Sequence, residues 1–161
     1  MYVAFCLAAN TGARRSELLR SRRDHLDFEG GTITIREKKR DCSRDMTFRT
    51  LPMSAGLKEA LRSWLQADHP GGPYTIGGHA GRPLTRQAMT KAFRSTVDGS
   101  FWQVVQGYHV LRHSFASNCA LKGVDQRIID AWMGHQTEAM RRRYSHLFPD
   151  QQQAAIRSVF G

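Results

Sequence analysis

The sequence has no apolar run long enough to cross a membrane. No window approaches the roughly 18 uninterrupted apolar residues that a membrane-spanning helix needs. The apolar start, Tyr2 to Ala9, also lacks the basic flank and the cleavage site of a signal peptide. We therefore expect a cytoplasmic protein.

Cysteine is scarce, with three residues in a chain of 161. Cys6, Cys42 and Cys119 lie far apart and form no C-x-x-C pair, which argues against a disulfide framework and against a zinc ribbon. We expect these thiols to be reduced and to serve mainly in packing.

Acidic residues are also few. The chain has 24 basic and 14 acidic residues, a formal net charge of +10, and the basic residues lie along its whole length. This distribution favours nucleic acid over a membrane surface as the partner, although genome composition or solubility can produce the same excess. Only 5 of the 24 basic residues are lysines, so a lysine with a chemical role has few candidates.

The length and the pattern of apolar residues predict one α+β domain, mainly α-helical with a small antiparallel β-sheet. No repeat and no low-complexity tract divides the chain. Two alternating stretches flank a polar hairpin tip at 38–45 and predict strands over 32–36 and 46–51. Helical spacing, caps and stop signals predict the helices, which we place at 2–9, 13–21, from Ser54 to His69, 85–97, 110–121, 126–133, 138–144 and 151–160.

A group of basic side chains lies at the start of the helix predicted over 110–121. His109, Arg112 and His113 have spacings that place them on adjacent faces of its first turn. Free N–H groups and a partial positive charge at a helix start, joined by cationic donors, suit an oxyanion or a phosphate. For His113 a hydrogen-bonded core position is favoured. A metal pair of His109 and His113 is disfavoured, because the carboxylate of H-E-x-x-H and a third ligand are missing.

Arg14 and Arg15 begin a helix just after Gly12, where the helix dipole mildly disfavours cations. A guanidinium can hold two phosphate oxygens at once, so Arg14 and Arg112 from different helices can neutralise a phosphorane from two sides. Taken singly, each arginine is better explained as a surface residue.

A basic run near the end of the chain, Arg141, Arg142 and Arg143, precedes Tyr144. These cations would hold a DNA backbone and favour the phenolate of the tyrosine. A solvated basic face with one packed tyrosine is the alternative interpretation of this run.

The order of these fragments resembles the catalytic domain of the tyrosine recombinases, the phage integrase family. The sequence T-G-A-R-R-S-E-L at 11–18 comes first and is followed by a basic hairpin. His109-x-x-Arg112-His113, Met133-Gly134-His135 and, nine residues later, Tyr144 complete the series. Each motif alone is weak, but the five in sequence over nearly the whole chain are specific.

The resemblance implies a DNA strand-cleaving and rejoining enzyme without metal or other cofactor. Arg14 and Arg112 would bind the scissile phosphate, while His109 and His135 would complete the clamp and assist proton transfer. Tyr144 would attack phosphorus to form a covalent 3′-phosphotyrosine, which keeps the energy of the broken bond for rejoining.

The resemblance also implies supporting roles. A hairpin lysine would protonate the leaving 5′-oxygen, and Lys38 is favoured over Lys39 because it directly follows the strand. Glu17 would orient the active-site side chains. The residues expected to bind the DNA backbone are all basic: Arg15, Lys39, Arg40, Arg141, Arg142 and Arg143.

Two departures from the family pattern bear on the domain organisation. Ala13 stands where a larger aliphatic residue is usual, and the family's N-terminal DNA-clamping domain is missing, so we expect residues 1–161 to form the catalytic domain alone. The partner would be double-stranded DNA, with self-association into a tetramer on it. Gln151 to Phe160 would dock on a neighbouring protomer or pack on its own core. A type IB topoisomerase-like enzyme and a non-cleaving DNA-binding module are the alternatives.

Overall fold

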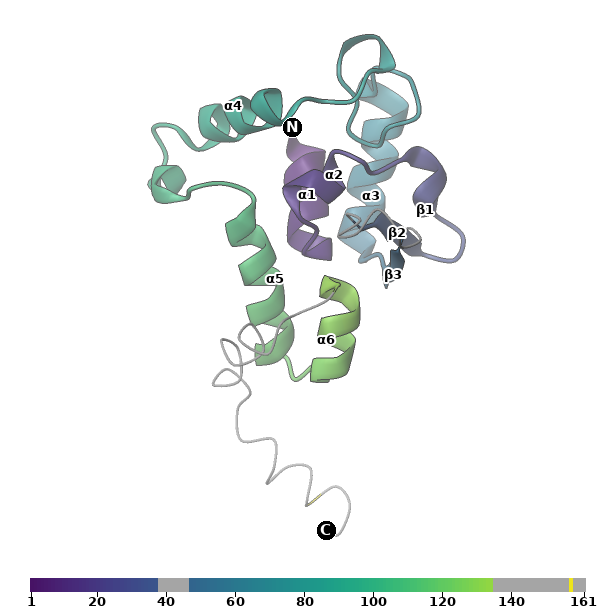
Figure 1. The fold of residues 1–161 in the computed structure, drawn as a ribbon, viewed down its shortest axis with the longest axis vertical. Helices are drawn as coiled ribbons and strands as arrows, with labels where there is room; N and C mark the ends of the chain where they lie inside the picture. The colour runs from purple at the N-terminus through teal and green to yellow at the C-terminus, as the bar shows by residue number, and fades with distance from the viewer. Residues whose placement is uncertain (38–46, 135–156, 158–161) are drawn as a thin grey trace.

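The described part of the computed structural model covers residues 1–37, 47–134 and 157. It confirms a mainly helical fold with one small antiparallel sheet (Figure 1). No helix in this part is both long and apolar enough to span a bilayer. The elements are α1 (Tyr2–Thr11), α2 (Arg15–Leu18), η1 (Arg23–His25), β1 (Leu26–Asp27), β2 (Thr32–Arg36), β3 (Phe48–Pro52), α3 (Ala55–Ser63), η2 (Trp64–Asp68), η3 (His79–Gly81), α4 (Arg86–Val97), η4 (Phe101–Val104), α5 (His109–Leu121) and α6 (Gln126–Met133).

Helix α1 forms the centre of the core because it carries apolar residues on several faces. It packs against α5 on one side and α3 on the other (Figure 1). Leu7 and Ala8 are fully buried. Gly12 ends the helix in the left-handed region (φ 59°), and its N–H donates to the carbonyl of Ala8 at 3.0 Å. Glycine adopts this conformation without the steric cost that a Cβ atom brings.

The sheet has the order β1-β2-β3, and β2 covers the predicted residues. Ile33 pairs with Leu51 and Ile35 with Arg49, and all four side chains are buried. Strand β3 runs over 48–52, and the predicted start at Met46 lies outside the described residues. Alternation therefore directs an arginine, Arg49, toward the same interior as Leu51.

The second predicted helix is wrong in extent, since α2 spans 15–18 and not 13–21. Ala13 is buried, and Arg14 is extended (φ −68°, ψ 149°) as the N-cap residue. At the other end, Ser21 accepts a hydrogen bond from the Thr75 N–H at 2.9 Å, and its hydroxyl donates to Thr75 Oγ1 at 2.9 Å. These two bonds to a distant segment take the chain out of the helix.

The remaining helix predictions in the described part hold, with small shifts at their ends. Ser54 and Thr85 cap α3 and α4 by accepting N–H groups three residues on, at 3.2 and 3.1 Å. The predicted third helix continues past Ser63 as a π-helical turn that ends at His69. Helix α5 begins at His109, one residue earlier than predicted. The helices predicted at 138–144 and 151–160 lie outside the described residues, except for residue 157, which is helical.

Candidate functional site

Arg14 is held at the start of α2 by the carboxylate of Glu17, three residues further on. The Arg14 N–H donates to Glu17 Oε2 and its Nη1 donates to Glu17 Oε1, both at 2.8 Å. The carboxylate lies in the first turn of the helix, where the dipole favours negative charge. It therefore offsets the unfavourable placement of the arginine that the sequence showed. The Arg14 side chain remains 36% exposed.

Glu17 is buried and shared between two arginines. Arg49 Nη2 donates to Glu17 Oε2 at 2.8 Å, the same oxygen that accepts the Arg14 N–H. Burial alone would raise the pKa of Glu17, but the hydrogen bond and charge of Arg49, with those of Arg14, outweigh it and lower the pKa below its ordinary value. Glu17 is therefore held as a carboxylate inside the fold.

Three arginines bind three consecutive backbone carbonyls at the end of α6. Arg49 Nε donates to the carbonyl of residue 132 at 2.6 Å, Arg112 Nη2 to that of residue 133 at 2.7 Å, and Arg14 Nη2 to that of residue 134 at 3.2 Å. A helix C-terminus leaves carbonyls without intrahelical partners and carries partial negative charge, so it suits guanidinium groups. We call Arg14, Arg49 and Arg112 the carbonyl clamp.

The clamp brings Arg14 and Arg112 to one place, as the sequence predicted. They bind the carbonyls of adjacent residues, whose Cα atoms are about 3.8 Å apart in any trans peptide. Arg112 is 1% exposed and also donates from Nη1 to the Gly12 carbonyl at 2.6 Å. Arg112 thus lies in the interior, and Arg14 reaches toward the surface.

A cavity of about 410 Å³ opens beside Arg14. Arg14, Arg15 and Arg86 line it together with His109, the first residue of α5. His109 is exposed, and its ring lies edge-on to the half-buried ring of His113, with 4.4 Å between centroids. No acidic residue is among the eight described residues that line this cavity, so it presents cations and N–H donors to an anion.

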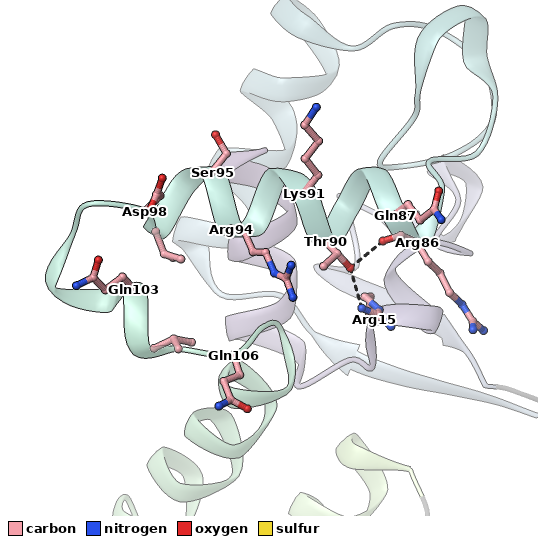
Figure 2. Close-up of a pocket in the computed structure, with 12 residues that line it drawn as sticks. Arg15, Arg86, Gln87, Thr90, Lys91, Arg94, Ser95, Asp98, Gln103 and Gln106 are labelled. Carbon is pink, nitrogen blue, oxygen red and sulfur yellow. Dashed lines mark hydrogen bonds between the residues drawn. The ribbon is translucent and has the colours of Figure 1, made fainter.

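A groove along α4 continues from this cavity. Arg86, Lys91 and Arg94 of α4 line it together with Arg15 of α2. Figure 2 shows Arg15 and Arg94 on the same side of α4, with Lys91 extending from the other side. Arg15 Nη1 donates to Thr90 Oγ1 at 2.9 Å. The groove and the cavity share Arg15, Arg86 and Gln106 in their linings. We call Arg86, Lys91 and Arg94 the α4 cations; together with Arg15 they give the cavity a positively charged extension.

The structure brings Arg14, Glu17, His109 and Arg112 into one region and places Arg15 at its edge. Arg49 and the α4 cations were not among the residues predicted from the sequence. Two features of the sequence could have indicated them: Arg49 alternates in phase with the buried Leu51, and the segment of α4 is rich in basic residues. Among the described residues, no group of three or more His, Cys, Asp or Glu is placed to hold a metal ion. The predicted residues outside the described part are Lys38, Lys39, Arg40, His135, Arg141, Arg142, Arg143 and Tyr144.

Known proteins resemble this chain in sequence and in fold. Tyrosine recombinase XerC of Azotobacter vinelandii is 32% identical over 142 residues, which cover 86% of this chain and 45% of that protein. The structure of XerA recombinase matches with a TM-score of 0.76 at 24% identity, covering 100% of this chain and 58% of that one. The Tn1549 transposon integrase in complex with transposon right-end DNA matches with a TM-score of 0.76 at 20% identity, covering 99% and 58%.

The class defined by this fold is that of the tyrosine recombinase catalytic domain. The sequence model of the phage integrase family matches residues 1–151, and the chain belongs to that family. It spans about half the length of the curated relatives it matches.

Proposed function

We propose that this chain is the catalytic domain of a site-specific DNA recombinase that cleaves and rejoins strands through Tyr144. The observation that carries the proposal is the convergence of Arg14 and Arg112 on adjacent carbonyls at the end of α6, beside a cavity that His109 lines. Guanidinium groups that are fixed before substrate arrives can stabilise charge on a phosphate without reorganising at the moment of reaction.

The substrate group is a backbone phosphodiester of double-stranded DNA. Arg14 and Arg112 hold its non-bridging oxygens, and His109 and His135 add donors and assist proton transfer. Each arginine acts from a separate helix, so negative charge that develops on a phosphorane is met from two directions. Glu17 keeps Arg14 oriented and does not touch the substrate.

Tyr144 passes its phenolic proton to His109 or His135, its oxygen attacks phosphorus, and the bond from phosphorus to the 5′-oxygen breaks. A phosphotyrosine ester forms on the 3′ side, and the departing 5′-oxygen takes a proton from Lys38, with Lys39 as the fallback. Attack by a 5′-hydroxyl on the ester reverses these steps and rejoins a strand. The ester conserves the energy of the broken bond, so the reaction needs no nucleotide cofactor and no metal.

Among the described residues, Tyr108 is the tyrosine that lines the cavity, and it is a poor nucleophile. It is 3% exposed and packs against the rings of Phe5 and Phe93. Burial raises its pKa to about 12, so its phenolate is rare at neutral pH. This supports the assignment of the nucleophile to Tyr144.

The positively charged surface supports double-stranded DNA as the partner. The α4 cations would bind phosphates beside the cleaved one, together with the basic residues predicted from the sequence: Arg15, Lys39, Arg40, Arg141, Arg142 and Arg143. Residues 1–161 form the strand-cleaving domain in this proposal. It acts in the cytoplasm, and four copies assemble on two DNA sites when strands are exchanged.

Trapping on nicked suicide DNA substrates tests the proposal. The unchanged chain should form a covalent adduct that survives denaturant, and a chain that carries Tyr144→Phe should lose it. Tyr108→Phe is the matched control and should keep the adduct. Salt-sensitive binding with no adduct on a cognate site would leave only a DNA-binding module, and loss of the adduct in the Tyr108 variant would move the nucleophile there.

The general acid has its own test. Lys38→Ala should slow cleavage of ordinary DNA and recover on a substrate with a 5′-bridging phosphorothioate, because the sulfur leaves without a proton donor. Lys39→Ala serves as the comparison. Recovery only in the Lys39 variant would transfer the acid role to that residue.

A further inference from the structure

We propose that Arg49 is a positioning residue that fixes the Arg14 side of the active site, the base of the β2–β3 hairpin and the end of α6 relative to one another. The inference rests on the proposed function, since it concerns the geometry of the same cleavage site. Arg49 does not line the cavity beside Arg14, so it acts through the groups that it binds.

The Arg49 guanidinium contacts three separate parts of the fold. Nη2 donates to Glu17 on α2 at 2.8 Å, Nη1 donates to Oε1 of Glu37 at 3.1 Å, and Nε donates to the carbonyl of Trp132 at 2.6 Å. The side chain is 6% exposed. A planar guanidinium directs its donors at fixed angles, so the three partners are held in one relative arrangement; the ammonium of lysine has no such fork.

Through its ion pair with Glu37, Arg49 fixes the position of the base of the hairpin. The Glu37 N–H donates to the Thr47 carbonyl at 2.9 Å, and Thr47 Oγ1 donates to Glu37 Oε2 at 2.9 Å. Glu37 is the residue before Lys38 in the sequence. The ion pair with Arg49 thus sets the point from which the chain departs toward the proposed general acid.

By binding the end of α6, Arg49 also fixes the position at which the chain leaves that helix. Gly134 precedes His135 in the sequence and has a φ of +63°. A Cβ atom at Gly134 would overlap Glu37 Oε1 and come within 3.1 Å of Arg49 Nη1. The backbone thus passes directly against the Arg49–Glu37 pair, and this contact sets where the chain leaves α6.

Stability alone does not account for an arginine at this place. Two carboxylates and a guanidinium lose their hydration here, and a well-packed apolar set of similar volume is often as stable. The network supplies fixed distances between three elements, each of which leads to a residue of the proposed mechanism. A displacement of one ångström in such groups can reduce the rate of the chemical step strongly.

The test uses Arg49→Lys in the full chain, measured by single-turnover cleavage of the suicide substrate. We expect the cleavage rate constant to fall about 10- to 100-fold, while the dissociation constant for DNA changes by less than about twofold. Because the hairpin base is one of the displaced parts, a 5′-bridging phosphorothioate should restore part of the loss. The control is Arg127→Lys on α6, where the side chain is 92% exposed.

A folded Arg49→Lys chain that cleaves as fast as the control would overturn the inference, as would a rate loss that the phosphorothioate leaves wholly unchanged. If Arg49→Lys does not melt cooperatively, Glu37→Gln decides, since it keeps the side-chain shape and removes the charge that pairs with Arg49. It should show slower cleavage with recovery on the phosphorothioate; unchanged cleavage would overturn the inference. Absence of an adduct with the unchanged chain would instead overturn the proposed function itself.

Discussion

Replacing Glu17 by glutamine should destabilise the fold in a way that depends on pH. The carboxylate accepts from Arg49 Nη2, from Arg14 Nη1 and from the Arg14 N–H, all at 2.8 Å, and it is 1% exposed. Glutamine keeps the size of the side chain, but it carries no charge and turns an N–H₂ group toward one of the guanidiniums. Arg14 is then left without its anion, and Arg49 keeps only its pair with Glu37.

The size of the effect follows from these hydrogen bonds. Removing one partner of a buried ion pair costs about 3 to 5 kcal/mol, because the other charge stays buried without compensation. Arg14 is 36% exposed and recovers part of its hydration, and Arg49 keeps its pair with Glu37, so we place the loss at the lower end, at about 3 kcal/mol at pH 7.

The pH dependence has a defined sign. The pKa of Glu17 is lowered in the folded chain from its ordinary value of 4.5. The carboxylate therefore contributes its full stability above pH 4.5 and loses it as the pH falls toward the folded-state pKa. The difference between the unchanged chain and Glu17→Gln should narrow over that acid range.

Urea unfolding followed by circular dichroism measures this difference at pH 7 and at intervals below pH 4.5, with Glu29→Gln at an exposed turn as the control. The control should have the same free energy of unfolding as the unchanged chain at every pH. A loss below about 1 kcal/mol at pH 7 would refute the buried-ion reasoning. A larger loss that stays constant into the acid range would show that shape, and not charge, is what the substitution disturbs.

The groove and the end of α6 give two further predictions. Changing all three α4 cations to glutamine should make the slope of log affinity for DNA against log salt concentration shallower, by about 0.9 for each phosphate that these side chains neutralise. Fluorescence anisotropy measures this slope. The control is Lys122→Gln, at the end of α5, which should leave the slope unchanged. Gly134→Ala should reduce the free energy of unfolding by about 1 to 3 kcal/mol, because its Cβ atom would overlap Glu37. Gly99→Ala is the matched control, since Gly99 has a similar φ of +68° and no neighbour within 4 Å; an equal loss in both variants would leave backbone strain as the only cause.

The features of the fold that the sequence predicted depend on short-range chemistry. Ser54 and Thr85 cap helices through bonds to residues three positions on, and Gly12 ends a helix through its own φ. Strand β2 shows its alternation within five residues. The extent of α2 was wrong because Ser21 is tied to Thr75, 54 residues away, and no local pattern reports such a bond.

The residues of the candidate site also fall into those that the sequence indicates and those that only the folded chain brings together. Arg14 and Arg112 were predicted from motif order, and the helix dipole already indicated that Arg14 needed a special reason to lie where it does. The compensation by Glu17 is local, at i+3, and was within reach of sequence reasoning. Arg49 was not, because its three hydrogen bonds join residues 12, 32 and 83 positions away, and only the assembled sheet and α6 bring them together.

The carbonyl clamp also explains how a chain of net charge +10 can hold three guanidiniums close together before any phosphate binds. Repulsion among them is offset by Glu17, by Glu37 and by the negative end of the α6 dipole. The two carboxylates lie on the buried side, against Arg49, while Arg14 extends toward the cavity. The negative charges therefore lie on the interior side of the arginines, and the positive charge of Arg14 lies on the side of the cavity. An incoming phosphodiester meets fixed donors there, with no competing carboxylate among the described residues that line the cavity.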